Sequence, residues 1–220
     1  DLYGLHVVRV DRRIADTPAE RDRLLGLGYQ VRMCADDVSE EGKKTEWLMQ
    51  RTINQLENSL KKLLTDPSDR RVIVSGWNVA ELDMMALPPC HMDYRFVAFE
   101  NPRVLNLVMT IRSWDLFLGA PANIAATSIF LAIMARLAGF EPGVVTIQAT
   151  NAHIYEDDFD QVRELLAREH LDAPKLILSD NIKRIERLED VSGAFTRIEP
   201  VDITLEGYES HAAIKAPMAA

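Results

Sequence analysis

Hydrophobic positions recur along parts of this chain with the spacing of a helix. Residues 45–65 place leucine and isoleucine side chains near one helical face, and Pro67 disfavours helix just before it, so this helix should end there. Residues 123–138 are apolar almost all round, which predicts a helix buried in the core with Asn123 as its N-terminal cap. Residues 159–169 have an apolar and a charged face and predict a further, amphipathic helix.

Short runs of β-branched and aromatic residues predict strands. Residues 71–78 predict a buried strand, and residues 94–100 and 103–112 flank Asn101-Pro102, the pattern of an antiparallel pair across a turn. Strands and helices follow no regular strand–helix–strand order, and no linker divides the chain, so we expect the α+β class and a single domain over 1–220. Later strands are expected at 143–150, 174–179 and 201–207.

The composition is that of an acidic globular protein. A formal net charge of −9 argues against a surface that binds duplex nucleic acid, because neutralising a phosphate backbone needs clustered Lys and Arg. No apolar run approaches the length that crosses a bilayer, so we expect a cytoplasmic protein that requires neither membrane nor nucleic acid. A small anionic ligand is compatible with this charge, because a few arginines can form a local positive pocket.

The two cysteines invite different interpretations. Cys34 and Cys90 lie far apart without CxxC spacing, which argues against a disulfide framework or a zinc site, and we expect no metal. A lone cysteine is most often a small buried hydrophobe, which is the interpretation of Cys34. Cys90 lies in LPPCH, where Pro88-Pro89 fix the approach of the chain, although this pentapeptide alone still favours a structural cysteine. His91 could act in acid–base chemistry, but neighbouring residues on a strand face opposite ways.

Arginines, a histidine and a tyrosine indicate possible contacts to a phosphate and a sugar. Arginine presents a planar fork of donors that suits a phosphate, although isolated arginines such as those of DRR usually form surface ion pairs. Arg112, in RSWD, lies between apolar segments, where a solvated face is not expected. His153 and Tyr155 would point the same way on an extended strand and could hold a sugar hydroxyl. By itself, this pair favours a core histidine with an unrelated tyrosine.

Four separate motifs resemble the thymidylate synthase family, in the family's order. DPSDRRVIVSGWNVAELDMMALPPCH (66–91) resembles the block from the arginine pair to the catalytic cysteine, and RSWDLFLGAPANIA (112–125) resembles RSxDxxLGxPFNIA. HIY (153–155) is similar to the sugar-binding HxY, and LEGYESHAAIKAPMAA (205–220) is similar to the terminal GYxPHPxIKAPxA. The resemblance covers about residues 66–220 and implies the family's mixed sheet packed with helices.

The resemblance implies a reaction and its catalytic residues. Cys90 would add to C6 of a pyrimidine nucleotide and turn C5 into a nucleophile, and 5,10-methylenetetrahydrofolate would supply the one-carbon unit. Asp115 would contact the pterin of this folate and belong to the catalytic set. LGLGYQVR (25–32) is similar to the family's LGxxYGxQWR with a gap, which makes Tyr29 a catalytic-site tyrosine. The implied reaction is the conversion of dUMP to dTMP.

Further contacts to substrate, folate and partner follow from the same resemblance. Arg112 and Ser113 would hold the 5′-phosphate of a pyrimidine nucleoside monophosphate. Arg70 and Arg71 would reach into the site of a neighbouring subunit, which implies a homodimer. The remaining substrate-binding residues would be His91, Asn123, His153 and Tyr155, the last two at the 3′-hydroxyl. The folate pocket would be lined or closed by Leu87, Asp115, Leu118, Gly119 and Ala220.

Asn123 carries the argument for uracil. An amide can donate to O4 and accept from N3–H of uracil, whereas the similar cytidylate hydroxymethylases place Asp at this position. A 5-hydroxymethylase acting on dUMP or another pyrimidine nucleotide is an alternative, because it needs the same Cys90 and Asn123. A non-catalytic nucleotide- or RNA-binding relative is the alternative from another class. The residues that separate these functions lie mostly in 1–65, where the family's proton-relay glutamate has no assigned counterpart.

This sequence also departs from the family motifs at individual positions. Ala122 replaces the phenylalanine of PFN, which opens the wall where the aromatic ring of the folate packs. Asn151 replaces an acidic residue before HxY. These departures suggest a divergent branch of the family.

Overall fold

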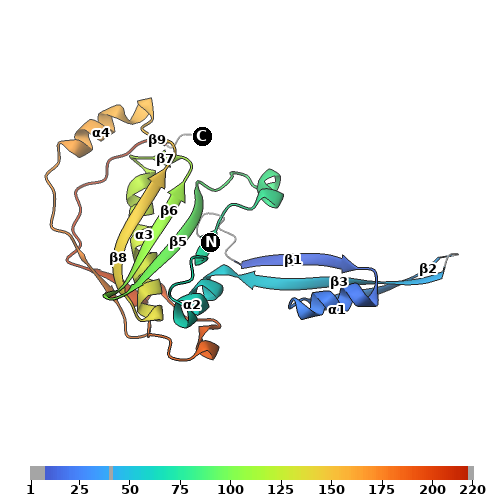
Figure 1. Ribbon diagram of the computed structural model, residues 1–220. Coiled ribbons are helices and arrows are strands. Elements are labelled where there is room, and N and C mark those ends of the chain that lie inside the picture. The colour runs from blue at the N-terminus through green and yellow to red at the C-terminus, as the bar shows by residue number, and fades with distance from the viewer. Residues whose placement is uncertain (1–7, 40–41, 218–220) are drawn as a thin grey trace. The chain divides into compact units, whose positions relative to one another are not determined.

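The structure is a computed structural model that describes residues 8–39 and 42–217 of the chain (Figure 1). The chain falls into two compact units, one spanning residues 6–55 and the other residues 56–220. Both units combine helices with sheets, which confirms the α+β class expected from the sequence. The expectation of one domain over the whole chain stays a prediction.

A three-stranded antiparallel sheet and one helix form the smaller unit. Its strands are β1 (Val8–Ala15), β2 (Gln30–Ser39) and β3 (Gly42–Asn54), in the order β1-β3-β2, and its helix is α1 (Pro18–Gly26). Thr17 caps α1, because its side chain accepts a hydrogen bond from the backbone N–H of Glu20 at 3.2 Å. The core of this unit is made of buried Ala15, Leu24, Tyr29 and Met49.

The helix predicted over 45–65 is wrong in its first half. Residues up to Asn54 belong to β3, and only α2 (Gln55–Thr65) is helical. β3 is the central strand of its sheet, so its backbone groups pair with β1 on one side and β2 on the other. Met49 is fully buried while its neighbour Leu48 is not, which is the alternation of a strand with one covered face. The predicted end of the helix is confirmed.

A four-stranded mixed sheet forms the centre of the larger unit (Figure 1). Its strands are β4 (Ile73–Ser75), β5 (His91–Glu100), β6 (Arg103–Ile111) and β8 (Glu141–Ala149), in the order β4-β5-β6-β8. β4, β5 and β6 pair antiparallel, whereas β8 runs parallel to β6. The predicted antiparallel pair is therefore confirmed. β4 is shorter than predicted and is half-buried, because Val74 is 1% exposed and Ile73 is 44% exposed.

The long helix α3 (Gly119–Ala138) packs against this sheet and completes its core. Leu131, Met134 and Leu137 of the helix are buried, as are Leu107 and Met109 of β6. By length and composition α3 could cross a membrane, but the core helix of a globular unit has the same properties. The packing against β6 and β8 identifies α3 as such a core helix.

α3 begins before Asn123, the residue predicted to cap it. The helix starts at Gly119, and the turn that leads into it is held by Asp115. Oδ1 of Asp115 accepts hydrogen bonds from the backbone N–H groups of Phe117 and Leu118 at 2.9 and 3.2 Å. Asn123 therefore lies inside the helix, and its side chain is available for another contact.

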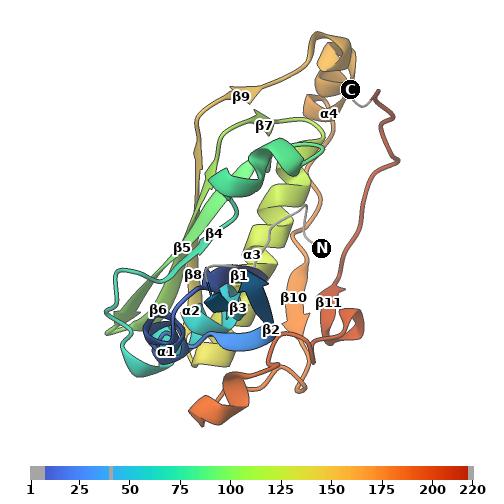
Figure 2. The same ribbon diagram turned by 90° about the vertical axis from the view of Figure 1, so that its right-hand side faces the viewer.

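Shorter elements complete the larger unit (Figures 1 and 2). β7 (Trp114–Asp115) and β9 (Ala152–His153) pair in parallel, and β10 (Lys175–Leu178) pairs antiparallel with β11 (Ile203–Glu206). The last two strands confirm the predictions at 174–179 and 201–207, and α4 (Phe159–Leu166) confirms the amphipathic helix with an earlier end. Short 3₁₀ turns lie at Val79–Met84, Glu156–Asp158, Leu188–Val191 and Pro200–Asp202.

Candidate active site

Arg112 holds the loop that carries Cys90. Cys90 directly precedes β5 and is partly exposed, and its backbone C=O accepts a hydrogen bond from the Arg112 N–H at 2.9 Å. The Arg112 side chain donates from Nη2 to the Pro88 C=O at 2.8 Å and from Nε to the Pro89 C=O at 3.1 Å. A permanent positive charge therefore lies against the backbone that leads into Cys90. These hydrogen bonds fix the backbone that positions Cys90.

The remaining nitrogen of Arg112 is open to another ligand. Nη1 has no protein partner within residues 8–39 and 42–217, and the adjacent Ser113 is partly exposed. The guanidinium carbon lies 6.0 Å from the centre of the Trp77 ring, the outer limit of a cation–π contact. The phosphate contact expected of Arg112 and Ser113 stays a prediction, and Nη1 is the donor it would use.

His91 is buried directly beside Cys90. It is 9% exposed and stacks on Tyr94 with ring centres 6.1 Å apart. A bulge between His91 and Asp93 shifts the register of β5, which explains why His91 and Tyr94 share a face. Burial lowers the pKa of His91, so its ring is neutral at neutral pH. Its Nε2 has no hydrogen-bond partner in the described part of the chain, and its role in substrate binding stays a prediction.

Trp114 and Asn123 are joined by a hydrogen bond between their side chains. The indole Nε1–H of Trp114 donates to Oδ1 of Asn123 at 3.1 Å. Asn123 projects from the first turns of α3 and is partly exposed. Since the indole holds Oδ1, the amino group Nδ2 is the donor that Asn123 offers to a ligand.

The paired strands β7 and β9 bring Asp115 and His153 opposite one another. The Trp114 N–H donates to the Asn151 C=O at 2.7 Å, and the Leu116 N–H donates to the His153 C=O at 2.9 Å. These bonds attach the RSWD segment to the HIY segment. Two motifs that are far apart in the sequence are therefore neighbours in the larger unit.

His153 and Tyr155 meet edge to face, with ring centres 5.0 Å apart. β9 ends at His153, so the contact is not produced by strand alternation as the sequence suggested. Nδ1 of His153 lies 3.2 Å from Oδ1 of Asn151. An amide oxygen can only accept a hydrogen bond, so Nδ1 is the donor in this contact and Nε2 is the ring nitrogen left for a ligand. The sugar contact of this pair stays a prediction.

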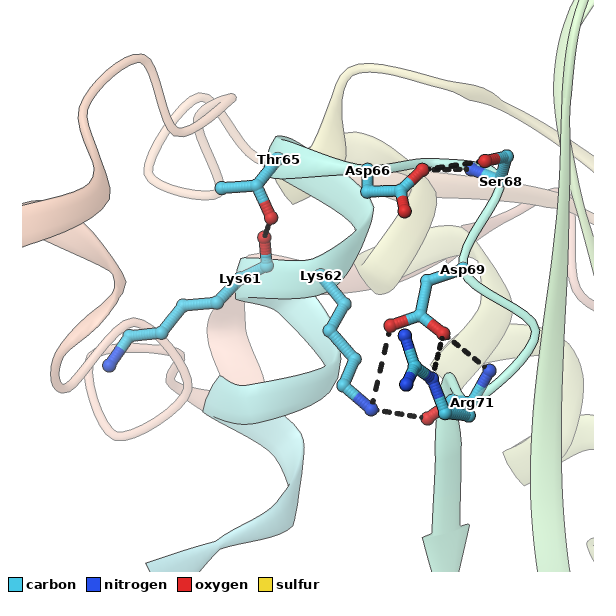
Figure 3. A network of polar contacts seen from close by, with 7 residues as sticks. All are labelled: Lys61, Lys62, Thr65, Asp66, Ser68, Asp69 and Arg71. Atoms are coloured by element: carbon cyan, nitrogen blue, oxygen red, sulfur yellow. Dashed lines mark hydrogen bonds and ion pairs between the residues drawn. The ribbon is translucent and has the colours of Figure 1, made fainter. Parts of the chain in front are cut away.

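The loop between α2 and β4 pairs Arg71 within the chain (Figure 3). Asp69 accepts hydrogen bonds from Nε and from the backbone N–H of Arg71, both at 2.8 Å, and its carboxylate lies 3.8 Å from Nζ of Lys62. The side-chain hydrogen bond from Arg71, more than the other contacts, lowers the pKa of Asp69. Arg70 is exposed, and its guanidinium has no hydrogen bond or ion pair with the residues that the structure describes. Arg70 is thus the arginine of this pair that is available to a partner.

The residues expected around a folate include exposed apolar side chains. Leu87 is 72% exposed and Leu118 is 38% exposed, and Gly119 is the first residue of α3. Asp115 uses Oδ1 in the turn before α3, which leaves Oδ2 for a ligand. Ala220 lies outside the described residues.

Tyr29 belongs to the smaller unit and is 3% exposed. Its hydroxyl donates to Asp11 and accepts a hydrogen bond from Nε of Arg13 at 3.0 Å. The guanidinium of Arg51 lies over its ring at 4.8 Å. These contacts account for a structural role, and the catalytic role expected of Tyr29 stays a prediction.

Comparison with known proteins identifies the family. Residues 11–220 match the family model described as thymidylate synthase. The chain belongs to the thymidylate synthase family. This match confirms the resemblance seen in the motifs of 66–220 and extends it upstream to residue 11.

Individual thymidylate synthases are similar to this chain. The enzyme of Pseudomonas putida is 40% identical over 173 residues, which cover 78% of this chain and 54% of that protein. The enzyme of Bordetella parapertussis is 37% identical over 200 residues, which cover 89% and 59%. The crystal structure of thymidylate synthase from T4 phage matches with a TM-score of 0.68 and 36% identity, over 76% of this chain and 59% of that chain. The chain thus spans between 54% and 59% of the length of these relatives.

Parts of this candidate site were not predicted from the sequence. No role was predicted for Trp114 or Trp77, and Pro88-Pro89 were assigned only a rigid approach to Cys90. The carbonyls of these prolines turn out to be the acceptors for Arg112. The sequence could have indicated Trp114 by its position in RSWD, because it occupies the variable position of the motif RSxD and the residues on both sides of it have predicted roles in the site.

Proposed function

We propose that this protein converts dUMP to dTMP by transferring one carbon from 5,10-methylenetetrahydrofolate. The observation that carries the proposal is the attachment of Arg112 to the carbonyls that precede Cys90, in a chain of this family. It places a fixed positive charge against the two residues that precede a partly exposed cysteine. Because the chain spans only part of the length of its relatives, the activity is inferred from the residues present.

Cys90 is the nucleophile in this proposal. Its thiolate sulfur forms a bond to C6 of uracil, and the electron pair of the C5–C6 double bond moves toward C5 and O4. C5 then attacks the methylene carbon of the folate and loses its proton, and the bond between that carbon and the folate nitrogen breaks. A hydride from the folate completes the methyl group and leaves dihydrofolate, while Cys90 departs from C6 as the thiolate and the C5–C6 double bond reforms. Arg112 holds the loop that carries Cys90 in place throughout the reaction, through its hydrogen bonds to the Pro88 and Pro89 carbonyls. Bound methylenetetrahydrofolate supplies the carbon and the hydride of the new methyl group.

Asn123 binds the base in the proposed complex. Nδ2 donates to O4 of uracil, and the second lone pair of Oδ1 accepts from N3–H, since the first is used by the Trp114 indole. A base with the opposite pattern of hydrogen-bond donors and acceptors would leave these groups unpaired, which costs binding free energy in a partly buried site. Support for this role comes from the position of Asn123 in the helix, where it is not needed as a cap.

The phosphate and the sugar of dUMP are bound by residues that flank the base. Nη1 of Arg112 and the hydroxyl of Ser113 donate to the 5′-phosphate, because a guanidinium provides charge and direction together. His153 and Tyr155 hold the 3′-hydroxyl, and their contact at 5.0 Å supports a common ligand. The hydrogen bonds between β7 and β9 support one continuous nucleotide site, because they join the two motifs.

The residues proposed to contact the folate fit a flat aromatic ligand. The exposed side chains of Leu87 and Leu118 offer apolar surface to its rings, and Oδ2 of Asp115 can accept from a pterin N–H. Ala122 provides less apolar surface than the phenylalanine of the family motif. We therefore expect weaker folate binding than a PFN sequence would give.

The same proposal includes a homodimer in the cytoplasm. Arg70 is exposed and unpaired within the described residues, so its guanidinium can reach the 5′-phosphate bound by a second copy. Arg71 is paired with Asp69 and would have to exchange that ion pair for the phosphate in order to bind it as well. Sharing of Arg70 would make each site incomplete without its partner.

Replacement of Cys90 tests the proposed reaction. Cys90→Ala should abolish dTMP formation and leave dUMP affinity within about threefold of the parent, because the phosphate, sugar and base contacts provide most ground-state binding. Cys34→Ala is the matched control, since it removes the other thiol of the chain and should keep turnover. Turnover by Cys90→Ala within about tenfold of the parent would exclude Cys90 as the nucleophile.

A further inference from the structure

The orientation of the Asn123 amide determines which pyrimidine it can bind. In one orientation the amide donates to O4 and accepts from N3–H, which matches uracil. Turned by half a rotation about its last bond, it would accept from the N4 amino group and donate to N3, which matches cytosine. An asparagine whose amide turns freely would therefore bind uracil and cytosine equally well. Selection of uracil requires another group that holds the amide in one orientation.

Trp114 is placed to supply that constraint. Its indole N–H can only donate a hydrogen bond, and it lies 3.1 Å from Oδ1 of Asn123. A turned amide would bring the amino group Nδ2 against this N–H, so a hydrogen bond would be lost and two donors would face each other. The oxygen of Asn123 is therefore kept on the side of the indole, and the amino group is kept on the other.

Both ends of this hydrogen bond are attached to fixed elements. Trp114 belongs to β7, and its backbone N–H donates to the Asn151 C=O at 2.7 Å. Its side chain is partly buried. Asn123 is carried by α3, near the helix face on which Ala120 and Thr127 are packed in the core of the larger unit. The backbone atoms that carry the two side chains are therefore held in place by their own elements.

We propose that Trp114 is a positioning residue that sets the preference for uracil over cytosine nucleotides by orienting Asn123. The inference rests on the proposed function, in which Asn123 binds the base. Trp114 acts through Asn123 rather than on the reacting atoms. It therefore changes the choice of base more than the overall affinity for a nucleotide.

Trp114→Phe is the direct test, because it keeps an aromatic ring and removes the N–H. Dissociation constants for dUMP and dCMP are measured by calorimetry on the parent, on this variant and on Trp47→Phe. Trp47 lies in the smaller unit and serves as the matched loss of an indole N–H. Trp114→Phe should reduce the preference for dUMP by about tenfold, the factor expected for one neutral hydrogen bond, and Trp47→Phe should leave it unchanged. A preference within about twofold of the parent in Trp114→Phe would overturn the inference.

A double-mutant cycle shows whether Trp114 acts through Asn123. In an Asn123→Ala background, Trp114→Phe should change the ratio of the two dissociation constants no further. A second reduction of the same size in that background would assign the effect to something other than the amide. The thermal unfolding midpoint of each variant identifies any loss of folding, and only variants that unfold near the parent temperature enter the cycle.

A measurement on the free protein is independent of the nucleotide. Exchange of the Trp114 indole proton with solvent, followed by NMR, should be slow in the parent and at least about tenfold faster in Asn123→Ala, because its acceptor is gone. Equal exchange in both proteins would refute the hydrogen bond and the inference with it. If exchange is slow but the parent binds no dUMP, the proposed function fails while the contact stands. If the parent prefers dUMP and Trp114→Phe does too, only the inference fails.

Discussion

The exchange of Asn123 for Asp should move the preference of the protein from uracil to cytosine nucleotides. The change keeps the shape of the side chain, and Trp114 can still donate to one carboxylate oxygen at the position of Oδ1. Only the second atom changes its character, from a donor amino group to an acceptor oxygen. That oxygen faces O4 of uracil with repulsion, whereas it can accept from the N4 amino group of cytosine.

The size of the effect follows from the number of groups that change. For dUMP, the loss of the donor to O4 leaves a buried acceptor unpaired, at about 1–3 kcal/mol. For dCMP, the new hydrogen bond contributes about 1 kcal/mol. The ratio of kcat/KM for the two nucleotides should therefore shift by about 2–4 kcal/mol, which is roughly 30-fold to 1,000-fold.

The assay compares kcat/KM for dUMP and dCMP in the parent and in Asn123→Asp, with product identified by mass. Asn123→Ala is the control, because it removes both the donor and the acceptor and should weaken selection without reversing it. A parent that prefers dCMP would contradict the assignment of uracil. A ratio that stays the same in Asn123→Asp would show that this residue does not contact the base.

Three further predictions concern the partner, the pH dependence and the core. A mixture of Arg70→Ala and Cys90→Ala subunits, each inactive alone, should regain activity after subunit exchange, because one site of the mixed dimer contains neither change; no recovery would exclude sharing of Arg70. Burial lowers the pKa of His91 below 6.5, so the unfolded state binds more protons than the folded state below that pH. The free energy of unfolding should therefore fall as the pH drops below 6.5, and urea denaturation should show a smaller fall in His91→Gln. Leu107→Ala removes a fully buried side chain and should lower the free energy of unfolding by about 2–5 kcal/mol. Val144→Ala, at an exposed position, should change the free energy of unfolding by less than about 0.5 kcal/mol. Equal losses in the two variants would contradict the described core.

The sequence predicts the elements of the larger unit better than those of the smaller one. The pair β5–β6 and the strand β8 carry local signals, namely β-branched runs and a turn residue at Pro102, that agree with their final pairing. The apolar side chains of residues 45–54 are compatible with the spacing of a helix or of a strand. The strand that they form depends on pairing with both β1 and β2. Such non-local pairing overrides a local helical pattern and cannot be read from a short window.

The candidate site is likewise predicted from the sequence only in part. Family motifs indicate Cys90, Arg112 and Asn123 as members of a site, because those positions are fixed in the pattern. The contact of Trp114 with Asn123 depends on where α3 begins and on how β7 is held by β9. The sequence predicts a helix that starts at Asn123 and uses its side chain as a cap, whereas α3 starts at Gly119. The correct start releases it for the hydrogen bond.

Covalent capture of 5-fluoro-dUMP by Cys90 tests the central claim most directly. Fluorine at C5 cannot leave as a proton does, so the bond between the sulfur and C6 should persist when methylenetetrahydrofolate is present. Intact-protein mass spectrometry followed by peptide mapping should find one nucleotide, with the folate bonded to its C5, attached to the peptide that contains Cys90, and none in Cys90→Ala. A protein that binds dUMP but forms no adduct, or forms it at Cys34, would contradict Cys90 as the nucleophile.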